Sequence, residues 1–170
     1  MKKILAIIFG AIIAASIFAS SAQAATLSDK QKQYITENCS SLKIQLQQLQ
    51  RADARSRVHL GAQYETITTN LMLNLNLRLV KSNLADADIA AQQTTFASER
   101  TRFKNDYIGY SQALDKLISI NCVEDPQAFY DQLAVTQKKR NDVDRSVERM
   151  SDILKKHRKS VESLKEKIKK

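Results

Sequence analysis

Few residues of this chain combine a reactive type with a spacing that would let them work together. Cys39 and Cys122 are the only cysteines, and His59 and His157 are the only histidines. These side chains could bind zinc by type, but none of them shows the short ligand spacing of structural zinc sites. We therefore expect no metal site, and no motif predicts a cofactor.

The carboxylates give no clearer sign of catalysis. Asp53, Glu99 and Asp106 could act as acids or bases, but nothing in their spacing brings them together and no pocket-forming loop accompanies them. The chain has no Ser/His/Asp or Cys/His arrangement with a scaffold behind it. His157 falls in an apolar seam and His59 lies beside polar residues, so both are expected to be structural. We predict that the protein is not an enzyme.

The first residues predict export. A basic start, Met1–Lys3, is followed by the apolar run Ile4–Ala19 and by Ala22-Gln23-Ala24, which matches a cleavage site. The alternative is an uncleaved membrane anchor, but the 16-residue apolar run is shorter than the roughly 20 residues that span a bilayer. We expect residues 1–24 to be cleaved. Residues 25–170 should form one exported domain, periplasmic, cell-surface or extracellular, with no transmembrane span.

Composition and periodicity predict an all-α fold. The chain has 3 Gly, 1 Pro and no Trp in 170 residues, which is too few turn formers for a β-rich fold. Apolar residues recur at alternating steps of four and three, the seam of a coiled coil or bundle helix. We expect helices at about 29–81, 84–120 and 126–168, forming an elongated antiparallel three-helix bundle in up-down-up order.

Local signals mark the helix boundaries. Ser28-Asp29-Lys30-Gln31 has the pattern of a capping box, and Asp125-Pro126 places an N-cap before proline at the first helical position. Lys81-Ser82-Asn83 is the expected break between the first two helices. Gly61 could mark a kink in the first helix, because Gly costs about 1 kcal/mol against Ala in a helix interior.

The first helix carries more apolar residues than one seam needs. The surplus lies in Leu71–Val80, where we expect exposed apolar surface suited to a partner or to self-association. The expected seam residues are Ile35, Cys39, Leu42, Leu46, Leu49, Leu60, Tyr64, Ile67, Leu71, Leu75 and Leu79.

A hairpin between the first two helices tests the pairing of the cysteines. If the helices turn at Ser82, residues equidistant from the turn face each other. The midpoint of Cys39 and Cys122 is 80.5, within two residues of that turn. Two cysteines in an exported chain are more often bonded than free. We predict a Cys39–Cys122 disulfide within the monomer that pins the bundle; the alternative is a pair of bridges between two chains.

Polar residues interrupt the seams of all three helices and should lie at one level of the bundle. One interpretation is a site that grips an anion. The other is a layer of ion pairs that fixes helix register, which the presence of both signs of charge favours. The residues are Arg51, Asp53, Arg55, Arg57, Arg100, Arg102, Lys104, Asp106, Arg140, Asp142, Asp144 and Arg145.

Nearly all of the excess positive charge lies at the C-terminus. Removing residues 1–24 would lower the formal net charge from +9 to +7, and Lys155–Lys170 alone carries +6, from eight basic residues and two Glu. An apolar stripe of Val161, Leu164 and Ile168 makes this segment an amphipathic basic helix, suited to an anionic surface. The basic residues are Lys155, Lys156, Arg158, Lys159, Lys165, Lys167, Lys169 and Lys170.

The alternative for this segment is that its lysines complement the negative end of the helix dipole and solubilise the terminus. No aromatic residue is interleaved with the basic ones, so sequence-specific nucleic-acid binding is not expected.

Two stretches carry a resemblance to other proteins: Arg51–Tyr64 (RADARSRVHLGAQY) and Cys122–Leu133 (CVEDPQAFYDQL). They resemble segments of small, uncharacterised exported helical proteins of ultrasmall, host-attached candidate-phylum bacteria. The resemblance implies an envelope or cell-contact setting and no active site. In overall character the chain is also similar to the basic helical periplasmic chaperone family of Skp, although it lacks the strand-forming body of that family.

The sequence therefore predicts a non-enzymatic exported helical protein that binds a protein partner or the cell envelope, with the basic C-terminal segment as the contact. The alternative is a holdase-like chaperone that cradles unfolded clients between its helices. Either could act as a homo-oligomer.

Overall fold

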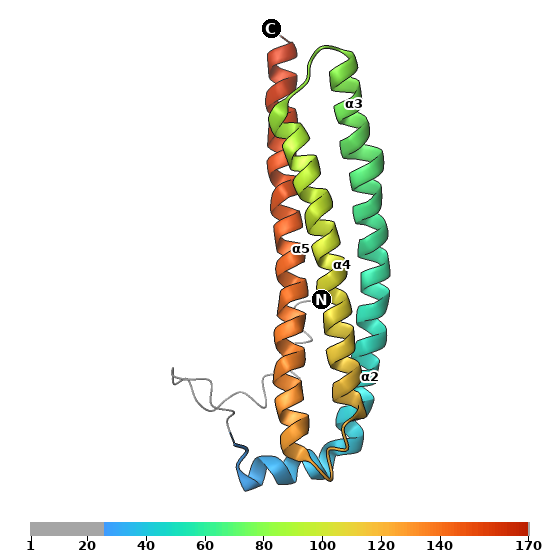
Figure 1. The fold of residues 1–170 in the computed structure, drawn as a ribbon, viewed down its shortest axis with the longest axis vertical. Helices are drawn as coiled ribbons and strands as arrows, with labels where there is room; N and C mark the ends of the chain where they lie inside the picture. Colours follow the sequence, from blue (N-terminus) through green and yellow to red (C-terminus); the bar gives the residue numbers. More distant parts are fainter. Residues whose placement is uncertain (1–25, 170) are drawn as a thin grey trace.

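The computed structural model describes residues 26–169, and over these residues it contains helices and no strand. The described elements are α2 (Asp29–Thr66), the π-helical segment η1 (Ile67–Leu73), α3 (Asn74–Lys81), α4 (Ala87–Ser119) and α5 (Pro126–Ile168). In this part of the chain α2, η1 and α3 form one continuous arm, and with α4 and α5 they build an elongated antiparallel bundle (Figure 1). The predicted all-α, up-down-up three-helix bundle is confirmed. The predicted signal peptide, residues 1–24, lies outside the described residues.

Side-chain caps begin each arm of the bundle. At the start of α2 the Ser28 hydroxyl accepts a hydrogen bond from Gln31 N at 3.4 Å, while Gln31 Oε1 accepts one from Ser28 N at 2.9 Å. At the start of α5 the Asp125 carboxylate accepts from Ala128 N at 2.8 Å. Asp86 caps α4, which begins three residues later than expected because this carboxylate binds the first free N–H groups.

The predicted disulfide is present. Cys39 of α2 and Cys122 of the loop after α4 are bonded, with their Cα atoms 5.6 Å apart and a sequence separation of 83. Both cysteines are buried in a core that also contains Leu46, Leu114 and Leu117. The bond therefore joins the first arm to the α4–α5 connection inside one chain.

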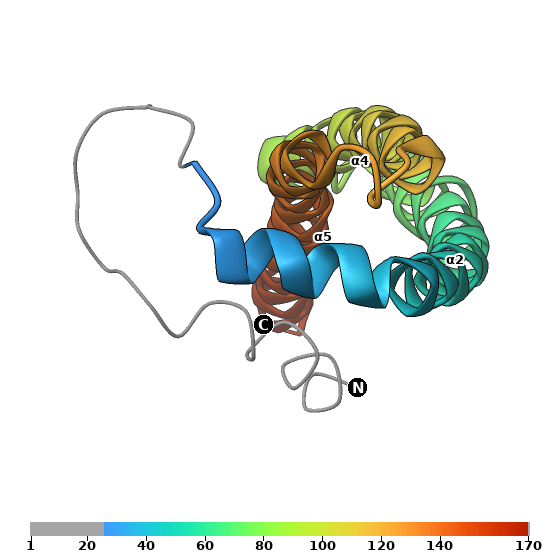
Figure 2. The same ribbon diagram turned by 90° about the horizontal axis from the view of Figure 1, so that it is seen from below.

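The first turns of α2 depart from the straight helix that the sequence predicts. They lie across the lower end of α5, and α2 then bends to run along the bundle (Figures 1 and 2). The sequence from Asp29 to Gln50 contains neither Pro nor Gly, so no helix-breaking residue causes the bend. Tertiary contacts hold it: Leu27 N donates to Gln127 Oε1 at 3.0 Å, and Ile35 packs in the same core as Phe129.

The main irregularity of the first arm is the π-helical segment η1. The possible kink at Gly61 is not found. The arm passes Gly61 as regular α-helix. Tyr64, Thr68 and Met72 are buried at steps of four residues, and each such step overshoots an α-helical turn by about 40°. The wider π-turns absorb this drift and keep one face toward the core. The Thr68 hydroxyl assists by donating to Tyr64 O at 2.7 Å, a bond that competes with the α-helical ladder.

Because of this change of helical period, the prediction of one seam residue is wrong. Leu71 was expected in the seam from regular spacing, but its side chain is 60% exposed, whereas that of Met72 is 1% exposed. The regular four-and-three pattern fails at this point because it assumes α-helical geometry, which η1 does not have.

The helix α4 lies at the centre of the core. Its Phe96 and Phe103 pack against Tyr64 of α2, Met72 of η1 and Met150 of α5. The Tyr64 ring meets both phenylalanines edge to face, with ring centroids 5.9 and 5.5 Å apart. Contacts between α4 and α5 are the most extensive of the bundle, while α2 touches α5 far less. The first arm is thus held mainly through α4.

Candidate functional site

A polar network at mid-height joins the three arms at Asp53. The Tyr110 hydroxyl of α4 donates to Asp53 Oδ2 at 2.7 Å, and Arg140 Nη2 of α5 donates to Asp53 Oδ1 at 3.3 Å. Beside it, the Arg57 guanidinium lies over the Tyr107 ring, 5.3 Å from its centroid. Both oxygens of the Asp53 carboxylate are therefore used within the protein.

Not every predicted member of this polar layer joins the Asp53 network. Arg100 instead forms an ion pair with Glu65. Arg100 and Tyr110 are ten positions apart, which is about 15 Å along α4. Arg100 therefore lies at a different level of the bundle, and the prediction of a single layer is wrong for it.

A second polar cluster connects α4 to α5 between those two levels. Asp106 accepts a hydrogen bond from the Ser146 hydroxyl and lies 4.0 Å from Arg149 Nη2. Arg149 Nε also donates to Glu99 at 2.6 Å, and Arg102 pairs with the same carboxylate at 3.4 Å. The carboxylates considered for catalysis are thus held in ion pairs and hydrogen bonds between helices.

The remaining predicted members of the layer lie on the surface of the bundle. Arg145 pairs with Asp142 within one turn of α5. Arg51 and Arg55 are exposed and make no ion pair with a described residue, and Lys104 is exposed as well. Asp144 lines a small pocket beside Asp53. The predicted set therefore divides into two interhelical clusters, the separate Arg100–Glu65 pair and a group of charges at the surface.

The pocket beside Asp53 has a volume of about 110 Å³. Ligand sites usually have 300–1,000 Å³, roughly three times as much or more. Asp53 and Arg140, which line the pocket, pair with each other, and this pairing supports the interpretation of a layer that fixes the register of the three arms.

Alkaline pH should destabilise the fold through this network. Burial, together with the hydrogen bond to Asp53 and its charge, raises the pKa of Tyr110, and burial also raises the pKa of Tyr64 and Tyr107. Above about pH 10 the unfolded chain releases these phenol protons while the folded chain keeps them, so the free energy of unfolding falls as pH rises. Denaturant unfolding at a series of pH values measures this fall.

Tyr110→Phe should make that alkaline fall shallower. The variant keeps the ring and removes the titrating hydroxyl, and below about pH 10 it should cost on the order of 1 kcal/mol for the lost hydrogen bond to Asp53. Tyr130→Phe is the matched control, because the Tyr130 hydroxyl makes no hydrogen bond with a described residue. An unchanged alkaline slope in Tyr110→Phe would contradict the role of the buried phenol.

The basic C-terminal segment is helical over its described part and lies at the upper end of the bundle. α5 continues to Ile168, and its C-terminal end stands beside the turn between α3 and α4 (Figure 1). Lys155 pairs with Asp152 at 2.8 Å, Arg158 with Glu162 at 2.8 Å, and Lys169 with Glu166 at 3.3 Å. These exposed pairs contribute little stability.

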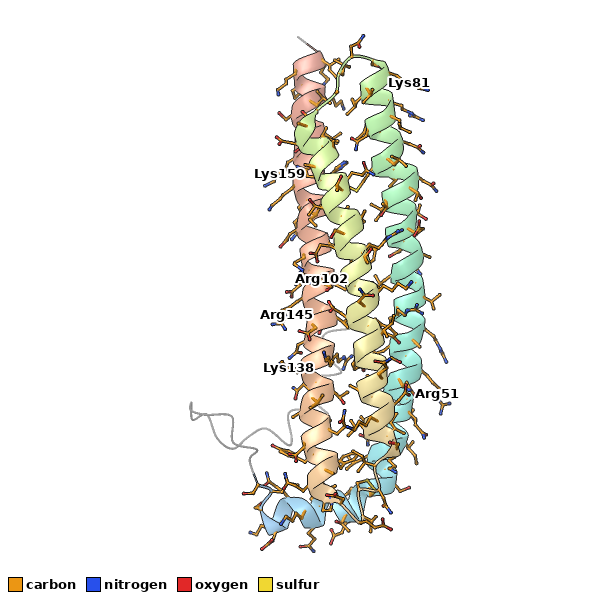
Figure 3. The ribbon with its side chains drawn as sticks, viewed as in Figure 1. Arg51, Lys81, Arg102, Lys138, Arg145 and Lys159 are labelled. Atoms are coloured by element: carbon orange, nitrogen blue, oxygen red, sulfur yellow. A yellow bond between two sulfur atoms is a disulfide. The ribbon has the colours of Figure 1, made fainter. Side chains whose placement is uncertain are left out.

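Four lysines of this segment keep their charge unpaired. They point to solvent and make no ion pair with a described residue, and Figure 3 shows Lys159 directed away from the bundle. Lys81, at the end of α3, adds an exposed charge at the same end of the bundle. Lys170, the last predicted member, lies outside the described residues. The four are Lys156, Lys159, Lys165 and Lys167.

An exposed apolar row lies on the same end of the bundle. Its members are 37–62% exposed. Three of them belong to η1 and α3 and follow each other at steps of four and three, the spacing of a helix-packing seam, while the fourth lies in the turn after α3. We call this set the α3 row: Leu73, Leu77, Val80 and Leu84.

The expected apolar surplus of Leu71–Val80 is therefore partly solvent-facing. Leu79 of the same arm is buried, so α3 packs one face on the core and leaves Leu77 and Val80 on another. Soluble proteins usually bury a row of this kind against another surface. The upper end of the bundle thus combines unpaired positive charge with exposed apolar side chains.

The histidines do not form a site. His157 is half-buried in α5, where burial lowers its pKa, and its Nε2 has no hydrogen-bond partner in the described chain. His59 is exposed on α2, with Nε2 3.1 Å from Gln63 Nε2. Among the described residues, no three His, Cys, Asp or Glu side chains are close enough to hold a metal ion.

Comparison with protein families, curated proteins and solved structures finds no match to this chain. Within residues 26–169, no helix has the length and hydropathy needed to cross a bilayer. The candidate functional site therefore rests on the geometry of the upper end: the basic α5 segment and the α3 row.

Proposed function

We propose that this protein is a non-enzymatic exported helical protein that binds the cell envelope or an envelope protein through the upper end of the bundle. The observation that carries the proposal is the meeting of two features far apart in sequence. The basic segment of α5 and the α3 row lie at the same end of the bundle. The Cys39–Cys122 disulfide is compatible with an exported protein.

The charge of this end suits an anionic surface. Each Lys or Arg near an anionic membrane contributes about 1 kcal/mol of attraction, and four lysines of the segment have no competing partner within the described chain. Burial of the α3 row can add apolar contact area to this electrostatic attraction, as in helices that lie at a membrane interface. An envelope protein with an acidic, partly apolar surface offers the same two features.

The proposal includes no catalytic step. The mid-height carboxylates are bonded to arginine, tyrosine or serine side chains of neighbouring helices, and the pocket beside them is small. The four unpaired lysines of the basic α5 segment lie at the upper end, where they are exposed. Exposed charge of one sign is suited to binding and offers no enclosed site for a reaction.

The experiment that tests the proposal is fractionation of the source cells, with the envelope washed first at low and then at high salt. We expect the protein to stay with the envelope at low salt and to be released at high salt, because salt screens the attraction of exposed charges. Recovery of all the protein in the low-salt wash would contradict it.

A holdase-like chaperone is the second candidate, and the α3 row is the observation that favours it. Exposed leucines can bind apolar segments of an unfolded client. The purified protein should then slow aggregation of a chemically unfolded client. Leu77→Gln with Val80→Gln should abolish the effect, whereas Ile44→Gln with Val58→Gln, which are 53 and 63% exposed on α2, should not.

A further inference from the structure

A second cavity lies at the lower end of the bundle, far from the basic segment. It has a volume of about 300 Å³ and is formed where the first turns of α2 cross the first turns of α5. Because α2 crosses α5 here and does not run along it, the two helices cannot interdigitate over their whole width. The crossing, visible in Figure 2, leaves a hollow between them.

The hollow has an apolar floor and a polar rim. Leu27, Ile35 and Phe129 line it and are almost completely buried, at 6, 8 and 2% exposure. Lys30 and Tyr34 also line it and are exposed to solvent. A ligand in this hollow would therefore place an apolar body against the floor and a polar group at the rim.

The rim offers hydrogen-bond donors that the protein does not use. Lys30 is the only charged residue that lines the hollow, and it makes no ion pair with a described residue; its neighbour Asp29 lies 4.0 Å from Lys32 instead. The hydroxyls of Tyr34 and Tyr130, which also line the hollow, make no hydrogen bond within residues 26–169. One ammonium and two phenol groups match a carboxylate, which accepts hydrogen bonds and carries negative charge.

We propose that this cavity binds an aliphatic monocarboxylate of medium chain length, with the chain on the Leu27–Ile35–Phe129 floor and the carboxylate at Lys30. The volume stands at the lower limit for ligand pockets, so a single chain suits it and a two-chain phospholipid does not. This inference is independent of the proposed function, because the cavity and the basic segment lie at opposite ends of the bundle.

The test is isothermal titration of the purified protein, disulfide intact, with sodium decanoate and separately with 1-decanol. We expect saturable binding of decanoate to one site. Lys30→Gln should weaken decanoate binding about tenfold and leave decanol binding unchanged, because only the carboxylate needs the ammonium. Lys32→Gln is the matched control: it removes the same charge two residues away, does not line the cavity, and should leave decanoate binding unchanged.

A second variant tests the chain-binding floor. Leu133, half-buried in the cavity wall, is replaced by Trp to fill the hollow, and binding of both ligands should be lost while the thermal unfolding midpoint is retained. Three results would overturn the inference: no saturable heat with decanoate, equal weakening by Lys30→Gln and Lys32→Gln, or undiminished binding in a folded Leu133→Trp. Attachment to anionic vesicles without decanoate binding would also overturn it, while leaving the proposed function of the basic end intact.

Discussion

Replacing Cys39 and Cys122 together by alanine should lower the free energy of unfolding by about 2–5 kcal/mol. The bond closes a loop with a sequence separation of 83 residues, so its loss restores much conformational freedom to the unfolded chain. Alanine is the suitable replacement because both cysteines are buried and serine would add unbonded hydroxyls. Denaturant unfolding followed by far-UV circular dichroism measures the change.

Reducing agent provides the control for this prediction. It should destabilise the wild-type protein by a similar amount and leave the double-alanine variant unaffected, since these are the only cysteines of the chain. The first turns of α2 should be affected most, because the bond fixes them to the α4–α5 connection beside the apolar cavity. Equal unfolding midpoints for the wild type and the variant would show that helix packing alone holds this end.

Neutralising four lysines of α5 should abolish attachment to anionic membranes at physiological salt. The variant carries glutamine at Lys156, Lys159, Lys165 and Lys167. At about 1 kcal/mol for each charge, binding to vesicles rich in anionic phospholipid should weaken by about 4 kcal/mol, or close to a thousandfold. Glutamine has nearly the helix propensity of lysine, so α5 should remain folded. Co-sedimentation with vesicles at low and high salt measures the loss.

The matched control removes the same charge elsewhere on the bundle. Arg51, Arg55, Lys138 and Lys139 are exposed and make no ion pair with a described residue, and Figure 3 shows Arg51 and Lys138 below the basic segment. Glutamine at these four positions should leave vesicle binding within a few-fold of wild type. An equal loss in both variants would mean that total charge, and not the placement of charge on α5, decides attachment.

The sequence indicated much of the helical framework through local signals. The Ser28–Gln31 capping box and Asp125 mark helix starts that the structure contains, because a cap depends on residues three or four positions apart. The cysteine pairing also followed from sequence, since an antiparallel hairpin relates residues by their distance from the turn. The basic C-terminal segment is visible in composition alone.

Regular periodicity failed where the backbone is irregular. The assumption of 3.6 residues per turn placed Leu71 in the seam, but η1 rotates it to solvent and buries Met72. The adjacent Thr68 and Thr69 were the available signal in the sequence. Their hydroxyls donate to Tyr64 O and Glu65 O, yet threonines often make such bonds in regular helices. The burial of Thr68, one of these two threonines, distinguishes this segment, and burial is known only from the structure.

By itself, then, the sequence determined the helices, their order, the disulfide and the position of the excess charge. Each of these depends on nearest neighbours along the chain or on one antiparallel turn. The tertiary structure alone decided that α2 bends across α5, that Asp53 binds Tyr110 and Arg140 while Arg100 binds Glu65, and that the α3 row stays uncovered. These outcomes depend on which faces of three long helices meet. Contacts between side chains far apart in sequence determine those faces, and local sequence patterns do not contain them.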